Sequence, residues 1–255
     1  MKFSVIVCSH RPERSKRIEA HFQRVLTSQD YEFILIPDAR SLCEGYNRGF
    51  ARSTGEIIIF SHDDIELIPP NAAELIQGHL QNFDLIGVGG TTQLIDGNWI
   101  SAGDPYVFST TAAPETDDGQ YRLLVYGAGS LVVTGIKALD GCFLACRRAV
   151  AQSLPFDEKN FDGFHLYDVD FSYRAFCAGY RLAVCRDLPL IHFSKGNNDA
   201  EYHRYKGLFE QKFQGTLDNV QHAPWKYASI VCHHEQLAQS ASPERIGRLL
   251  TALSR

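Results

Sequence analysis

The sequence predicts an α/β fold in which a mostly parallel central sheet is flanked by helices. Short apolar segments alternate with amphipathic segments over the first ninety residues, and this alternation is typical of βαβ units. The expected strands are Phe3–Cys8, Glu32–Pro37, Glu56–Phe60 and Leu85–Val88. Because crossovers between parallel strands are right-handed, we expect these four segments to run parallel in one sheet. Ligands of such sheets bind beyond the carboxyl ends of the strands.

The rest of the chain adds helices, an irregular stretch and further strands. Segment 91–137 lacks helical periodicity and is rich in Thr, Gly and aromatic residues, which predicts an inserted excursion at the sheet rim. Gly55 is placed to end the preceding helix in a left-handed cap. The expected helices are Pro12–Leu26, Leu42–Ser53, a segment after Pro70, a segment from Arg148, Tyr167–Ala178, Glu201–Phe213 and Pro243–Leu253, and the later strands are Ala138–Cys146, Leu182–Cys185 and Leu190–His192.

Composition and charge limit the classes of function. The chain has 255 residues, 44% of them hydrophobic and 22% charged, which is typical of a globular protein with a substantial core. A formal net charge of -5 without a basic stripe argues against nucleic acid as a partner. We interpret the basic run Arg11–Arg17 as a solvated helix face. No segment has the length of a membrane span or of a signal peptide's apolar region, which predicts a cytoplasmic protein, with peripheral attachment to the inner face of the membrane left open.

The most informative segment is the apolar run after Gly55, which ends in His62, Asp63 and Asp64. Strands this apolar are usually buried on both faces, as in sheets covered by helices. An imidazole and two carboxylates at the end of such a strand suit a divalent cation that holds a phosphorylated ligand. The alternative is a polar turn in which Asp64 caps a helix.

Other strand ends also carry polar residues. Ser9 and His10 follow the first strand, and Asp38 follows the second. Because parallel strands point their carboxyl ends to one edge, these residues predict a nucleotide-sized site there. His192 ends a later strand and is expected either to join the metal or to be a structural histidine. Lys195, followed by a glycine, suits a loop that closes over a diphosphate.

The helix expected from Tyr167 carries two acidic residues with different surroundings. Successive helical residues turn by about 100°, so Asp168 and Asp170 point to nearly opposite sides. Asp170 has Arg174 four positions later, a spacing that favours an ion pair on the helix surface. Asp168 is the freer carboxylate and is a candidate general base toward an attacking hydroxyl. Its alternative role is to complement the helix dipole.

The order of these motifs resembles the inverting glycosyltransferases of family 2, which have the Rossmann-like GT-A fold. The likeness covers roughly residues 1–195. Ser61–Asp64 stands where that family has its Asp-x-Asp metal motif, with histidine in place of the first aspartate as in a His-x-Asp subgroup. Tyr167–Asp170 stands where it has Glu-Asp-x-Asp, with tyrosine in place of the glutamate. The other matching segments are Ser4–His10, Tyr46–Gly49, Ser53–Ile57, Asp140–Arg147, Phe156-Asp157, Gly179–Arg181 and His192.

The resemblance implies a role for each candidate residue. Asp168 would be the catalytic base, and Asp64 with His192 and His62 would hold the cation. Asp63 is left as a substitute metal ligand or as a bystander beside the donor. The residues assigned to the donor are Ser9, His10, Asp38, Asn47, Asp63 and Lys195. One catalytic domain would span 1–215, with a nucleotide-binding half (1–90), the insertion (91–137) and an acceptor-side half (138–215), before a helical tail at 216–255.

The implied reaction moves a sugar from a nucleoside diphosphate sugar, UDP-linked by analogy with relatives, to a hydroxyl of a carbohydrate or glycoconjugate acceptor with inversion. Mn²⁺ or Mg²⁺ would assist, and the mixed imidazole and carboxylate ligands favour Mn²⁺. The alternatives are a non-catalytic nucleotide-sugar-binding protein, a nucleotidyltransferase and a metal-dependent hydrolase. The aromatic residues between Trp99 and Tyr126 would either stack on acceptor sugars or form the core of the insertion. The sequence is compatible with an oligomer.

Overall fold

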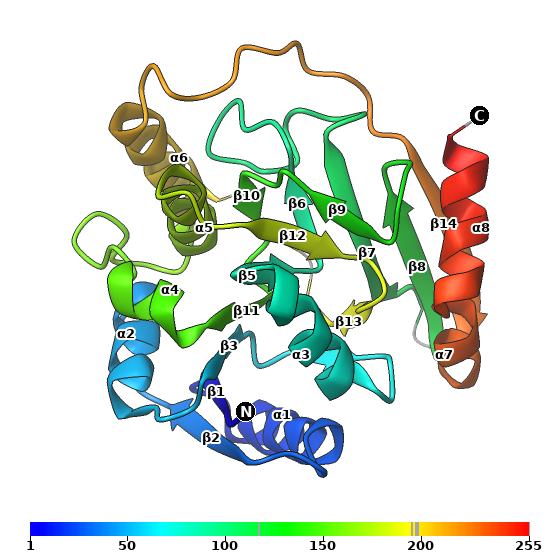
Figure 1. Cartoon of the computed structure of the whole chain (residues 1–255), viewed down its shortest axis with the longest axis horizontal. Helices are drawn as coiled ribbons and strands as arrows, with labels where there is room; N and C mark the ends of the chain where they lie inside the picture. Colours follow the sequence, from blue (N-terminus) through cyan, green and yellow to red (C-terminus); the bar gives the residue numbers. More distant parts are fainter. Residues whose placement is uncertain (117, 195, 197–198, 255) are drawn as a thin grey trace.

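The computed structural model describes residues 1–116, 118–194, 196 and 199–254. They form two mixed β-sheets with helices packed around them (Figure 1). The first sheet has the strand order β2-β1-β3-β11-β5-β12-β9. Its strands are β1 Phe3–Cys8, β2 Tyr31–Ile36, β3 Ile57–Ser61, β5 Leu85–Gly87, β9 Val132–Thr134, β11 Phe143–Arg147 and β12 Leu182–Cys185.

The four strands predicted from the first ninety residues run parallel in this sheet. β1 pairs in parallel with β2 and β3, and β12 pairs in parallel with β5. β11 lies between β3 and β5 and is antiparallel to both. The predicted α/β class is therefore confirmed, while the antiparallel insertion was not foreseen, because an apolar run carries no signal of its direction.

A second sheet contains most of the predicted insertion. Its strand order is β10-β6-β7-β13-β4, and β8 and β14 continue it from β7. β7 and β8 form an antiparallel hairpin. Its strands are β4 Ile65–Leu67, β6 Gly89–Thr91, β7 Val107–Pro114, β8 Gln120–Tyr126, β10 Ala138–Leu139, β13 Leu190–His192 and β14 Tyr227–His233.

Helices cover both faces of the first sheet. β1 alternates between two apolar clusters, because Phe3, Val5 and Val7 join the residues of α1 and α3. Ile6 points the other way and joins residues of α2, α4, α5 and α6. This alternation follows from the pleat of a strand that is buried on both faces. The helices are α1 Pro12–Val25, α2 Leu42–Arg52, α3 Ala72–Asn82, α4 Arg148–Ser153, α5 Tyr167–Cys177, α6 Ala200–Lys212, the 3₁₀ turn η1 His234–Gln236, α7 Leu237–Ser240 and α8 Pro243–Leu253.

The C-terminal tail returns the chain to the second sheet. It holds the predicted helix Pro243–Leu253 and, in addition, strand β14, which pairs antiparallel with β8. α8 lies beside β14 and β8 (Figure 1), and its residues Ile246 and Leu250 share an apolar cluster with Leu123. Within the described part of the chain, no helix combines the length and the apolar character that crossing a membrane would require.

Gly55 has a different role from the predicted helix cap. α2 ends at Arg52, and the C-cap residue Ser53 is extended, with φ -81 and ψ 150. A Cβ on Gly55 would lie 2.6 Å from Ser4 Oγ and 2.7 Å from the carbonyl carbon of Phe3. The glycine is therefore required by its close approach to β1, and the left-handed cap was wrong.

Candidate active site

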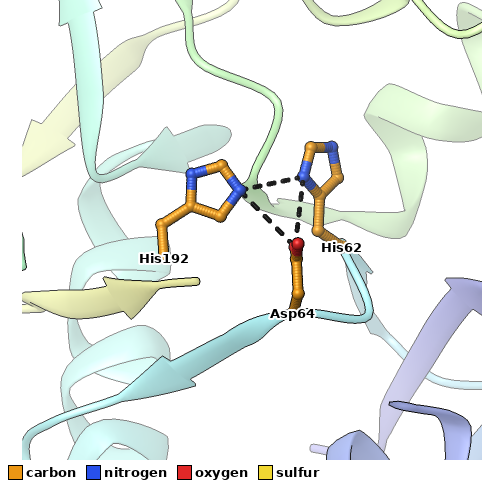
Figure 2. A group of neighbouring side chains, drawn as sticks. All are labelled: His62, Asp64 and His192. Atoms are coloured by element: carbon orange, nitrogen blue, oxygen red, sulfur yellow. Dashed lines mark hydrogen bonds and ion pairs between the residues drawn. The ribbon is translucent and has the colours of Figure 1, made fainter. Parts of the chain in front are cut away.

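The three predicted metal ligands come together just beyond β3. His62 Nδ1 lies 3.5 Å from His192 Nε2. Asp64 Oδ1 lies 3.9 Å from His62 Nδ1 and 3.5 Å from His192 Nε2. Figure 2 shows the two rings and the carboxylate pointing toward one another. Their ligand atoms all lie within 4.8 Å of one another, so one ion could contact all three side chains.

The strand pairing of the second sheet explains this meeting. After β3 the chain turns at His62–Asp64 and enters β4, so Asp64 precedes a strand and does not cap a helix. β13 pairs antiparallel with β4, which places His192 opposite Ile65. The backbone N–H of Phe193 donates to the carbonyl of Asp64 at 3.0 Å. Two strands far apart in the sequence thereby fix the histidine beside the carboxylate.

The three side chains of this group shift one another's pKa values. Burial alone would raise the pKa of Asp64, but the hydrogen bond from His192 and the nearby imidazoles hold that pKa well below its usual range. Burial lowers the pKa of His62, and the charge of His192 lowers it further. For His192, the hydrogen bond to Asp64 and the charge of Asp140 outweigh burial and raise the pKa. A cation bound here would take the place of the His192 proton.

A first cavity, of about 260 Å³, reaches the group from the side of α1. Arg14 on α1 donates to Asp63 Oδ1 at 3.2 Å and to Asp64 Oδ2 at 3.0 Å. The Ser9 hydroxyl donates to Asp63 Oδ2 at 2.5 Å. Asp63 therefore points toward Ser9 and Arg14, not toward the two histidines. Asp64 is only 7% exposed, yet it lines this cavity, so an ion can reach it.

A second cavity, of about 220 Å³, lies on the other side of His62. It is lined by Asp168, Asp140, Trp99 and His192, among others. His62 lines both cavities. The metal ligands and the candidate base thus line two adjoining cavities that share this imidazole.

Asp168 faces the second cavity from the first turn of α5. The helix is entered through Leu166, a buried non-glycine residue at φ 59, which is a strained conformation of the kind found at functional sites. Burial, together with the charge of Asp140, raises the pKa of Asp168 to about 7. A carboxylate with a pKa near neutrality suits a general base.

Asp170 points into the protein, on the other side of the same helix. It is fully buried and accepts from Arg174 Nε at 2.7 Å and from Lys212 Nζ at 2.5 Å. The predicted pairing with Arg174 is present, but its placement on the helix surface was wrong. Two cations compensate the buried charge, which would otherwise be costly. Asp170 therefore ties α5 to α6 and leaves Asp168 as the carboxylate that lines the cavity.

Two residues assigned to the donor, Asp38 and Asn47, stand apart from this arrangement. Asp38 is exposed and pairs with Arg48 at 2.8 Å, and it lines neither cavity. Both groups of the Asn47 amide bond the backbone of Phe156, at 2.9 Å each. These bonds do not favour a donor contact for Asn47, because its donor and acceptor hold α2 to the segment after α4. Lys195 lies outside the described residues.

Several residues of the cavities were missed or misread in the sequence. Arg11 and Arg14 line the first cavity. Arg11 is exposed, but Arg14 pairs with Asp63 and Asp64, so a solvated face was the wrong interpretation for Arg14. The signal was available, because a helix that starts directly after a strand presents its first turn to the carboxyl edge of the sheet. Asp140 also lines the second cavity; it follows the short strand β10 and was quoted only as part of a motif.

The aromatic residues of the insertion have different positions. Trp99 lines the second cavity, and its Nε1 donates to Asp140 Oδ2 at 3.1 Å. Tyr126 packs against Trp225 with ring centroids 6.3 Å apart. Tyr121 packs against Phe193 at 6.4 Å. Only Trp99 of these three is placed to contact a ligand in the cavity.

A second group of potential metal ligands lies elsewhere in the fold. His79 Nε2 is 3.0 Å from both carboxylate oxygens of Asp187, and Cys185 is close to both residues. None of the three lines either cavity. Burial raises the pKa of the Cys185 thiol well above its usual value, which keeps it protonated. The hydrogen bonds between His79 and Asp187, which tie α3 to the turn after β12, account for this group.

Comparison with known proteins agrees with this fold. A model described as "Glycosyltransferase like family" matches residues 4–213. A Fuscovulum blasticum protein named "ATP synthase subunits region ORF 6" is 28% identical over an alignment of 221 residues, and the match covers 78% of this chain and 80% of that protein. The mannosyltransferase PcManGT from Pyrobaculum calidifontis, solved in complex with GDP-Man and Mn²⁺, is similar with a TM-score of 0.51 and 10% identity, over 98% of this chain and 73% of that one.

These findings agree with the motifs in the sequence. The structural likeness, at so low an identity, speaks for the fold alone. The family model covers most of the chain, including both motifs that follow β3 and open α5. The protein therefore belongs to the glycosyltransferase-like family and has the GT-A fold that its motifs resemble.

Proposed function

We propose that the protein transfers a sugar from a nucleoside diphosphate sugar to an acceptor hydroxyl, with a divalent cation and with inversion at the anomeric carbon. One observation carries this proposal. The group His62, Asp64 and His192 stands between two cavities, and the candidate base Asp168 lines the second of them. A donor diphosphate and an acceptor would then approach the reacting carbon from different sides.

The three side chains fit a divalent cation. Metal–ligand bonds of about 2.0–2.2 Å place neighbouring ligand atoms roughly 3.0–3.6 Å apart. The distances of 3.5, 3.5 and 3.9 Å in this group are close to that range. Two imidazoles and one carboxylate suit Mn²⁺ better than Mg²⁺, which prefers oxygen ligands. Bound there, the cation would offset the negative charge that develops on the leaving diphosphate.

The first cavity supplies further charge for the donor. Arg11 and Arg14 line it together with His10, so cationic groups lie next to the metal ligands. Guanidinium groups bind phosphate oxygens in a bidentate manner. We assign the diphosphate of the donor to this cavity. Uridine is the nucleotide that the sequence resemblance implies, and guanosine is the alternative because PcManGT was solved with GDP-Man.

The second cavity is assigned to the acceptor. Asp168 would take the proton of the acceptor hydroxyl as its oxygen attacks the anomeric carbon. The bond to the diphosphate breaks on the opposite face of the sugar, which inverts the configuration. Trp99 and Tyr202, two of the aromatic side chains that line this cavity, offer flat apolar surfaces to a sugar ring.

The first test is a binding screen followed by product analysis. Thermal shift with UDP- and GDP-linked sugars, each with and without Mn²⁺, should show stabilisation that needs both the nucleotide sugar and the cation. The product formed with an acceptor panel should have the anomeric configuration opposite to that of the donor, as measured by NMR.

Each other outcome identifies a different function. Free sugar released without an acceptor indicates a hydrolase. Pyrophosphate released from a nucleoside triphosphate and a sugar phosphate indicates a nucleotidyltransferase. Binding without turnover over the whole acceptor panel indicates a nucleotide-sugar-binding protein. A product that retains the donor configuration rejects Asp168 as the base of a single inverting displacement.

A further inference from the structure

The buried hydroxyl of Tyr167 lies between His62 and the turn before β11. Tyr167 Oη is 2.6 Å from His62 Nε2 and 3.0 Å from the carbonyl oxygen of Gly141. The other ring nitrogen of the same imidazole, Nδ1, faces Asp64 and His192. One side chain thus contacts the metal ligand on the side turned away from the metal position.

We propose that Tyr167 is a positioning residue that selects the metal-binding tautomer of His62. A carbonyl oxygen only accepts, so the bond to Gly141 uses the single hydroxyl proton of Tyr167. The Tyr167 oxygen must then accept from His62, which places the imidazole proton on Nε2. Nδ1 is left with its lone pair directed toward Asp64 and His192, as a metal ligand requires. This inference rests on the metal site of the proposed function.

The other tautomer is disfavoured by its hydrogen bonds. If Tyr167 donated to His62, the Gly141 carbonyl would lose the hydroxyl as its partner inside the protein. The proton on Nδ1 would then have to find an acceptor, but Asp64 Oδ1 is 3.9 Å away. The nearer atom, His192 Nε2 at 3.5 Å, donates its own proton to Asp64 and therefore does not accept. A buried polar group without a partner is costly, so the arrangement with the proton on Nε2 prevails.

Close packing keeps the tyrosine hydroxyl in this place. A Cβ on Gly141 would lie 2.2 Å from Tyr167 Oη and 2.6 Å from Asp168 Cβ, so only glycine allows this approach. The same turn is held by Asp140, whose Oδ1 accepts from the backbone N–H of Cys142 at 2.9 Å. The carbonyl that orients Tyr167 is therefore itself fixed.

The two departures from the family motifs are hydrogen-bonded to each other. Position 62 has histidine in place of aspartate, and position 167 has tyrosine in place of glutamate. The tyrosine hydroxyl can accept a hydrogen bond from an imidazole N–H and donate one to a carbonyl oxygen, as the geometry here requires. Tyr167 directly precedes Asp168 in α5, so the first turn of this helix carries both the residue that orients His62 and the candidate base.

The test compares Tyr167→Phe with Tyr46→Phe. The Tyr46 hydroxyl is also buried but has no hydrogen-bond partner among the described residues, and its ring packs against that of Tyr167 at 5.7 Å. Both variants remove one hydroxyl from the same aromatic cluster. Calorimetry with Mn²⁺ alone should show affinity about tenfold to a hundredfold weaker for Tyr167→Phe and unchanged for Tyr46→Phe. Equal Mn²⁺ affinity in Tyr167→Phe and the unsubstituted protein would overturn the proposal.

The imidazole tautomer provides a readout that needs neither metal nor activity. In metal-free protein with ¹⁵N-labelled histidine, long-range ¹⁵N–¹H correlation should show His62 with its proton on Nε2. In Tyr167→Phe, His62 should show a mixture of the Nε2–H and Nδ1–H tautomers, whereas in Tyr46→Phe its proton should stay on Nε2. A proton found on Nδ1 of His62 in the unsubstituted protein would contradict the inference, even if Tyr167→Phe does not fold. Failure of all variants to bind any divalent cation would instead contradict the metal-assisted function, while the tautomer result would still report on Tyr167.

Discussion

The guanidinium of Arg14 lies 3.0 Å from Asp64 Oδ2, so a fixed cation already contacts the carboxylate assigned to the metal. The same nitrogen is 3.2 Å from Asp63 Oδ1. A metal ion at Asp64 would be repelled by this guanidinium, whereas a diphosphate in the first cavity would attract it. Arg14 is therefore expected to leave the carboxylate for the phosphate when metal and donor bind together.

Replacing Arg14 should change metal binding and donor binding in opposite directions. For Arg14→Gln we expect Mn²⁺ alone to bind up to severalfold more tightly. The guanidinium side chain is 36% exposed and therefore partly screened by solvent, so its ion pair with Asp64 is worth about 1 kcal/mol. Nucleoside diphosphate in the presence of Mn²⁺ should bind more weakly, because one cationic contact is lost. Calorimetric titrations of each ligand measure both effects, and a parallel change in the two affinities would contradict this role.

Asp64 and Asp63 form a matched pair for testing the metal site. Asp64→Asn should weaken Mn²⁺ binding by more than about tenfold, because one of three ligands loses its charge. Asp63→Asn should leave Mn²⁺ affinity close to normal, because Asp63 contacts Ser9 and Arg14 instead of the histidines. Chelation of the cation should abolish transfer, and Mn²⁺ should restore it better than Mg²⁺. Equal losses of Mn²⁺ affinity in the two variants would indicate that Asp63 is also a metal ligand.

The rate of transfer should rise with pH through about 7. Asp168 acts as a base only when ionised, and burial with the charge of Asp140 raises its pKa to about 7. Transfer in Asp168→Asn should fall by roughly 10²- to 10⁴-fold while donor affinity stays normal. In Asp140→Asn the rise should move to lower pH, because the neighbouring negative charge is removed. A profile of kcat/KM that is flat between pH 5 and 9 would exclude Asp168 as the titrating base.

The raised pKa of Asp168 should also appear as a stability difference. Its value in the unfolded chain is about 3.8, and in the folded protein it is about 7. Stability from this group is therefore fully present below pH 3.8 and is progressively lost up to about pH 7. Asp168→Asn avoids this loss. In the presence of a chelator at pH 8, its free energy of unfolding should therefore exceed that of the unsubstituted protein by about 4 kcal/mol at most. The two proteins should converge near pH 4, and a variant that is less stable at pH 8 would contradict the assignment.

Most of the fold was predictable because the strands of the first sheet are strongly apolar and well separated. β4 was not predicted, because three residues are too few to show an alternation. β14 was missed although Ala228, Ile230 and Cys232 alternate on its inner face. Its pairing with β8, more than a hundred residues earlier in the chain, leaves no local signal.

The site was predictable where the chain itself fixes the geometry. His62 and Asp64 end a strand, and a strand end belongs to a known edge of the sheet. The approach of His192 depends on its pairing with β4, so its place at a strand end left a metal ligand and a structural histidine as alternatives, and only the resemblance favoured the ligand. The place of Arg14 in the first turn of α1 indicated its nearness to this edge. Its contact with Asp64, and the contact of the Tyr167 hydroxyl with His62, join distant segments and are not revealed by residue spacing. For Asn47 the motif suggested a contact with the donor, whereas its side chain is hydrogen-bonded to the backbone of Phe156.

Trp99 provides the test of the acceptor cavity. If an acceptor sugar stacks on its ring, Trp99→Ala should raise the acceptor KM roughly tenfold, because contacts of aromatic rings are worth about 0.5–1.5 kcal/mol beyond their burial. Donor affinity should be unchanged, since Trp99 lines the second cavity and not the first.

Two further variants separate stacking from other effects of Trp99. Trp99→Phe keeps a ring and should therefore retain most of the acceptor affinity. It loses the hydrogen bond to Asp140, a neighbour whose charge acts on Asp168, so the pH profile of transfer should shift. Tyr227→Ala removes an exposed aromatic residue, 52% accessible, which lines neither cavity, and it should leave both substrates unaffected. Steady-state kinetics with each substrate varied in turn separates these outcomes. An acceptor KM that changes equally in Trp99→Ala and Tyr227→Ala would place acceptor binding outside the second cavity.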